Sequence, residues 1–124
     1  MASYELAVSC QFNAAHFLRR YEGKCKRLHG HSYEVTALFT GMALDERGML
    51  VDFGEAKAWL NEAVERFDHM LLNDLPEFQS QNPTAENLAR VLFESLARIM
   101  DSSTVTLASL SVAENPGSFA TYRG

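Results

Sequence analysis

Cysteine is scarce in this sequence, because only Cys10 and Cys25 occur among its 124 residues. Two cysteines are too few for a disulfide framework, so we expect both to remain thiols in a reducing compartment. The sequence also lacks an apolar run near the roughly 18 residues of a membrane span, and its N-terminus lacks the features of a secretory signal. With 47% hydrophobic residues, we expect one folded, cytoplasmic domain over residues 1–124 with no membrane partner.

Positive charge is also in short supply, because 16 acidic residues outnumber 11 lysines and arginines and give a net charge of -5. A general nucleic-acid binder needs a basic surface, so we expect no nucleic-acid partner. The basic residues are unevenly spread, and five of them form a cluster in one short stretch: Arg19, Arg20, Lys24, Lys26 and Arg27. The cluster predicts either a local anion site or, as charge alone favours, a solvated loop.

Alternating apolar residues indicate two strands at the start of the chain. Over residues 4–16 the even positions are mostly apolar, which is typical of a strand with one buried face, and His16 ends that face. Over residues 29–40 the odd positions form a second such face, which begins with His29 and His31. If the two strands pair antiparallel, the end of the first lies beside the start of the second, and the three imidazoles converge.

Two helices are expected next. Asp52 and Glu55 form a capping-box pattern, and apolar residues follow at helical spacing from Ala56 to Phe67. Thr84 can cap a second helix, whose apolar residues repeat the same spacing up to about Met100.

The remaining segments complete the predicted order. Residues 68–83 should be mostly loop, because proline and asparagine interrupt any helical period there. Two last strands are expected at about 104–114 and 119–123, separated by the turn Asn115-Pro116-Gly117. The order ββααββ predicts an α+β fold, with one antiparallel sheet and both helices on one of its faces.

Three of the four histidines lie at predicted strand ends, which suggests a metal site. His29 and His31 point to the same side of a strand, and His16 from the neighbouring strand can complete a triangular set of nitrogen ligands. Three protein nitrogens suit a catalytic zinc ion with one coordination position open. The alternative is that these histidines are hydrogen-bonded packing residues.

The two cysteines have different predicted roles. Cys25 lies in a basic loop four residues before His29, where neighbouring cations and a metal could favour a thiolate that acts as a base. It could equally be a fourth zinc ligand, which would close the site and make the metal structural. Cys10 shares the buried face of the first strand, so packing in the core is its expected role.

Two further groups could take part in chemistry. Asp68 can orient His69 for proton transfer, although a histidine interacting with the end of a helix would look the same in sequence. Glu114 follows the inward-facing Leu110 and Val112, and a carboxylate at a buried strand end needs a partner such as a ligand with N–H donors. An exposed turn residue is the alternative for Glu114.

Taken together, these motifs resemble the 6-pyruvoyltetrahydropterin synthase family over nearly the whole chain. The residues that carry the resemblance are Phe12-Asn-Ala-Ala-His16, Cys25-Lys-Arg-Leu-His29-Gly-His31, Asp68-His69, Pro83-Thr84-Ala85-Glu86-Asn87 and Glu114. The three residues between the cysteine and His-Gly-His are most similar to the bacterial 6-carboxytetrahydropterin synthase branch, which serves queuosine biosynthesis.

The resemblance implies a role for each motif residue and an assembly. His16, His29 and His31 would bind zinc, and Cys25 would be catalytic. An Asp68-His69 dyad would also be catalytic, and Glu114 would anchor the pterin. The implied fold is the tunnelling fold, in which subunit sheets join into a barrel. The implied assembly is a homohexamer of two stacked trimers, with active sites between subunits.

The resemblance also implies a reaction. A zinc-dependent lyase would convert 7,8-dihydroneopterin triphosphate to 6-carboxytetrahydropterin, with release of acetaldehyde and triphosphate. The alternatives on the same scaffold are 6-pyruvoyltetrahydropterin synthesis and cleavage of the dihydroneopterin side chain. An alternative of another class is a non-catalytic module that binds zinc or pterin.

Overall fold

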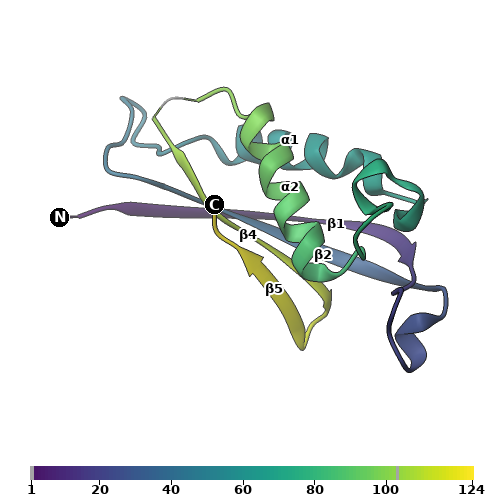
Figure 1. Ribbon diagram of the computed structural model, residues 1–124. Helices are drawn as coiled ribbons and strands as arrows, with labels where there is room; N and C mark the ends of the chain where they lie inside the picture. Colours follow the sequence, from purple (N-terminus) through teal and green to yellow (C-terminus); the bar gives the residue numbers. More distant parts are fainter. Residues whose placement is uncertain (1, 103) are drawn as a thin grey trace.

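The computed structural model describes residues 2–102 and 104–124, which form one five-stranded sheet and two helices. The sheet order is β3-β1-β2-β4-β5. The bounds are β1 (Tyr4–His16), β2 (His29–Gly41), α1 (Phe53–Val64), β3 (Met70–Leu71), α2 (Ala85–Ile99), β4 (Thr106–Asn115) and β5 (Ser118–Tyr122). Both helices lie on one side of the sheet, as Figure 1 shows, which confirms the predicted α+β fold.

The β1–β2 ladder brings the predicted histidines together. The two strands pair antiparallel over their whole length, from Tyr4 opposite Gly41 to His16 opposite His29. His31 lies opposite Ala14, so it shares a face and an end of the ladder with His16. Side chains alternate along both strands, which places all three imidazoles on the helix side of the sheet.

The helices begin at the predicted caps. A side-chain oxygen of Asp52 accepts a hydrogen bond from the Glu55 N–H (3.1 Å), and the Thr84 hydroxyl accepts one from the Asn87 N–H (3.1 Å). The apolar stripe of each helix is buried against the sheet. Within the described residues, neither helix combines the length and the apolar character needed to cross a membrane.

The segment between the helices differs from the prediction. Met70 and Leu71 form the short strand β3, which pairs parallel with Ala14 and Ala15 of β1. The sheet is therefore antiparallel except at this edge. A two-residue strand is too short to show a period, so the sequence predicted only a loop there.

The core lies between the helices and the sheet. The rings of Phe12 and Tyr33 stack with centroids 4.9 Å apart, directly below the histidines. Cys10 packs partly buried against this core, as predicted, and burial raises the pKa of its thiol to about 11.

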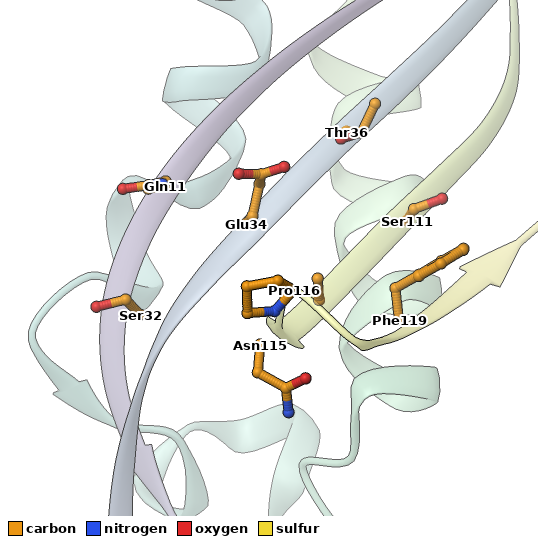
Figure 2. Close-up of a pocket in the computed structure, with 9 residues that line it drawn as sticks. Gln11, Ser32, Glu34, Thr36, Ser111, Asn115, Pro116 and Phe119 are labelled. Carbon is orange, nitrogen blue, oxygen red and sulfur yellow. The ribbon is translucent and has the colours of Figure 1, made fainter.

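The other face of the sheet carries no helix and is polar. A hollow of about 640 Å³ lies on it, with Glu34 between Gln11 and Ser111 and with Phe119 beside it (Figure 2). Ser32, Glu34 and Thr36 alternate with His31, Tyr33 and Val35, so this hollow and the histidines lie on opposite faces.

Candidate metal centre

Three imidazoles converge at the end of the β1–β2 ladder. One nitrogen from each of His16, His29 and His31 lies within 4.8 Å of the other two. Nε2 of His16 is 3.0 Å from Nε2 of His29. Ligands about 2.0–2.1 Å from a tetrahedral zinc ion are roughly 3.3 Å apart, so this spacing suits such an ion.

Backbone carbonyls orient two of the rings. Nδ1 of His16 donates to the Pro83 carbonyl (2.7 Å), and Nδ1 of His29 donates to the Arg27 carbonyl (2.7 Å). A carbonyl only accepts, so in the neutral form of each ring the proton lies on Nδ1 and Nε2 carries a lone pair toward the other ring. Two lone pairs 3.0 Å apart repel, and a cation bound by both removes that repulsion.

The third ring supplies a buried nitrogen without a partner. Among the described residues, Nε2 of His31 has no hydrogen-bond partner, and the Glu114 carboxylate is 3.6 Å away. The same carboxylate is 3.9 Å from Nε2 of His16, which is 1% exposed. Burial lowers the pKa of His16, opposed by the Pro83 carbonyl and Glu114, and so favours the neutral form that binds metal. The three residues therefore fit a divalent metal ion.

Glu114 borders both this centre and a neighbouring hollow. Its carboxylate is about 29% exposed and faces the histidines from β4. It also lines a hollow of about 250 Å³ at the start of α2, together with Ala85, Ser118 and Phe119. A ligand in the hollow could therefore contact Glu114 and extend toward the metal.

Cys25 lies outside the ligand set. It is half-buried in a 3-10 turn (Lys24–Lys26), and its carbonyl accepts a hydrogen bond from the Leu18 N–H (2.9 Å). Among the described residues, the group that could hold an ion contains the three histidines and not Cys25. This arrangement favours an open metal site over one closed by the thiolate.

Asp68 and His69 form a pair at the sheet edge and do not belong to the three-histidine group found among the described residues. Nδ1 of His69 donates to Asp68 (3.0 Å), and Asp68 also accepts from the Asn13 N–H (2.9 Å). The bond from Asn13, with a smaller effect of His69, holds the Asp68 pKa below its usual range. His69 has a left-handed backbone (φ 60°), and its side chain is 76% exposed. It lines a groove at this edge of the sheet together with His31 and Ser32.

The basic cluster divides into bound and free side chains. Arg19 donates to the carbonyls of Phe78 (2.7 Å) and Gln81 (3.4 Å), so it has a structural role. Lys24, Lys26 and Arg27 line a hollow of about 730 Å³ and form none of the ion pairs found among the described residues. The exposed part of the cluster could therefore hold an anion.

Several residues around the centre were not predicted from sequence. The Tyr33 hydroxyl lies 3.2 Å from Nδ1 of His16, and burial raises its pKa. Asn73, Asn82 and Pro83 contact the chain at and after His16 through polar bonds. Tyr33 continues the alternation of His29 and His31, and Pro83 begins a motif that carries the family resemblance, but neither signal indicated these contacts.

Comparison with known proteins finds a matching family model and several similar proteins. The family model described as 6-pyruvoyl tetrahydropterin synthase matches residues 5–124. The 6-carboxy-5,6,7,8-tetrahydropterin synthase of Bacillus subtilis (strain 168) is 34% identical, over 98% of this chain and 86% of its own. The protein of that name from Synechocystis sp. is 38% identical, over 90% and 86% of the two chains. The structure of Caenorhabditis elegans 6-pyruvoyl tetrahydropterin synthase superposes with a TM-score of 0.88 at 28% identity, covering 100% of this chain and 97% of its own.

Proposed function

The chain belongs to the 6-pyruvoyl tetrahydropterin synthase family, and on that premise we propose that it is a zinc-dependent 6-carboxytetrahydropterin synthase. Its substrate is 7,8-dihydroneopterin triphosphate. With uptake of water, the products are 6-carboxytetrahydropterin, acetaldehyde and triphosphate, in the route to queuosine. The observation that carries the proposal is the convergence of three histidine nitrogens beside the Glu114 carboxylate.

The carboxy product is preferred over the pyruvoyl product for two reasons. The curated relatives at 30–38% identity over most of the chain carry the carboxytetrahydropterin name. The interval of three residues between Cys25 and His29 also resembles that branch.

Each side chain of the site is assigned one part of the proposed reaction. A zinc ion held by His16, His29 and His31 supplies Lewis-acid chemistry that makes hydroxyl protons of the substrate easier to remove. Cys25 removes a proton from the substrate side chain, and His69, oriented by ionised Asp68, accepts or returns the next one. The two acid–base groups can then serve successive proton transfers.

Substrate binding is assigned to Glu114 and to the exposed part of the basic cluster. The Glu114 carboxylate accepts hydrogen bonds from the amino-pyrimidine edge of the pterin. The exposed cations of the basic cluster, Lys24, Lys26 and Arg27, supply the local positive charge that a triphosphate needs on an acidic protein.

We infer that the protein works in the cytoplasm as a homohexamer of two stacked trimers. Among the described residues, β3 pairs with β1 only at Ala14 and Ala15, so the outer edge of β1 from Tyr4 to Phe12 has no neighbouring strand and could pair with another subunit. β5 is the opposite edge of the sheet. Pairing of these edges between subunits would close the sheets into a barrel, with the helix-free polar face inside. His69 of one subunit could then reach the metal centre of another.

The product assay tests the function directly. Zinc-loaded protein incubated with dihydroneopterin triphosphate should release acetaldehyde and form a carboxypterin of matching mass. Formation of the pyruvoyl product alone would contradict the carboxy assignment. Turnover of dihydroneopterin itself, which lacks the triphosphate, would indicate that the reaction is side-chain cleavage. Binding of zinc or pterin without any turnover would indicate a binding module.

Changing Glu114 to Gln should weaken pterin binding about tenfold to a hundredfold, because a charged acceptor becomes a group with a donor facing N–H groups. Fluorescence titration of a pterin into the zinc-loaded protein measures the dissociation constant. Glu34→Gln is the matched control, because Glu34 lies on the opposite face and should leave binding unchanged. An unchanged constant for Glu114→Gln would remove this residue from the pterin site.

His69→Ala should lower kcat by about 10² or more with little effect on pterin affinity, because the ring transfers protons and does not hold the substrate.

The proposed assembly leads to a separate prediction for hexamers that contain two kinds of chain. Mixed hexamers of His69→Ala and Cys25→Ala chains should recover about a quarter of the wild-type activity if each site takes these residues from two subunits. Mixed hexamers as inactive as the separate variants would place both residues on one chain.

A further inference from the structure

The chain that follows β1 is held by side-chain amides in place of a neighbouring strand. Asn73 accepts from the Phe17 N–H and donates to the Phe17 carbonyl, both at 3.0 Å. Asn82 accepts from the Arg19 N–H (2.8 Å) and donates to the Arg19 carbonyl (2.9 Å). Each amide satisfies both backbone groups of one residue, as a paired strand residue does. The segment that leaves His16 is therefore fixed for three residues beyond the ladder.

Asn82 connects this segment to the metal centre. The next residue is Pro83, which is buried and whose carbonyl accepts from Nδ1 of His16. The Asn82 carbonyl in turn accepts from the Asn87 side chain (2.8 Å), which ties it to the first turn of α2. Asn82 and Pro83 thus bind both ends of the segment that runs from His16 to Arg19.

We propose that Asn82 is a positioning residue for the metal centre, which acts by holding the Pro83 carbonyl against Nδ1 of His16. This contact keeps the proton on Nδ1, aims Nε2 at the other two histidines and fixes the ring plane. The inference rests on the proposed function only in taking the three histidines as a metal site. It requires nothing about the pterin product.

Asn73 offers a matched comparison for Asn82. It makes the same two kinds of hydrogen bond to the same segment, and it is 4% exposed. It is not adjacent to a carbonyl that contacts a histidine of the centre. Loss of Asn73 therefore loosens the segment without releasing the contact to Nδ1 of His16.

The test is the affinity of the full chain for Zn²⁺, measured by competition with a chromophoric chelator, with stability measured separately on metal-free protein. Asn82→Ala should bind Zn²⁺ 10- to 100-fold more weakly than wild type, the usual loss when a group that orients a metal-binding histidine is removed. Its Co²⁺ complex should show a changed visible spectrum. Asn73→Ala should lose stability but keep Zn²⁺ affinity and the Co²⁺ spectrum near those of wild type.

Two results would overturn the inference. One is Zn²⁺ affinity in Asn82→Ala within twofold of wild type, and the other is an equal loss of affinity in Asn73→Ala. If either alanine variant does not fold, the pair Asn82→Asp and Asn73→Asp, which keep the acceptor and lose the donor, should give the same contrast in smaller degree. A wild-type chain that binds no Zn²⁺ would refute the proposed metal site and this inference together, whereas normal Zn²⁺ binding with a different product would refute only the proposed reaction.

Discussion

The Cys25→Ala variant should keep its zinc and lose turnover by a factor of about 10² to 10⁴, the usual contribution of one acid–base group. The reason is that Cys25 does not belong to the three-histidine group that could hold the ion among the described residues. Metal analysis of the dialysed protein and turnover of dihydroneopterin triphosphate give the two measurements. Together they separate a catalytic thiol from a metal ligand.

Cys10→Ala is the matched control for that experiment. Cys10 is the other thiol of the chain, packs against the core and has a raised pKa, so its loss should leave kcat near the wild-type value. Loss of zinc in Cys25→Ala would instead support a closed, structural metal site. Normal turnover in that variant would exclude Cys25 as the base.

The His31→Ala variant should lose the metal. Only two of the three ligand nitrogens remain in this variant. Its affinity for zinc should fall by more than the roughly 10- to 100-fold caused by removing a group that only orients a metal-binding histidine. Nε2 of His31 is buried without a hydrogen-bond partner, so metal-free His31→Ala should unfold at a temperature no lower than metal-free wild type. Zinc should stabilise the wild type and have no such effect on the variant.

Zinc content after dialysis against a chelator and thermal unfolding with and without zinc check this result. His69→Ala is the control, because His69 lies outside the three-histidine group and should retain metal. A His31→Ala chain that still carries about one tightly held zinc ion would show that the ion binds elsewhere.

The parts of the fold that follow a repeating pattern could be predicted from the sequence. Period-2 alternation placed β1 at Tyr4–His16, and the same alternation placed His29 and His31 on one face of β2. The antiparallel pairing was a condition of the prediction, and the structure confirms it, with His16 opposite His29. With that pairing, the alternation brings the three histidines together.

The contacts that support the centre could not be predicted in this way. Asn82 and Arg19 are 63 residues apart, and Pro83 and His16 are 67 residues apart. Asparagine and proline in a segment without a period indicate only a loop, whatever they contact in the folded chain. The role of Arg19 was hidden for the same reason, because counting charges does not show that its guanidinium is bound to backbone carbonyls.

The left-handed backbone at His69 sets stability against the catalytic role that we propose for its ring. A non-glycine residue in that conformation costs roughly 1–2 kcal/mol, and glycine would adopt it without that cost. The same conformation directs the backbone N–H to the Asn13 carbonyl and the ring to Asp68. Selection for thermal stability alone would therefore favour glycine at position 69, and a library screened only for heat resistance should lose the imidazole there.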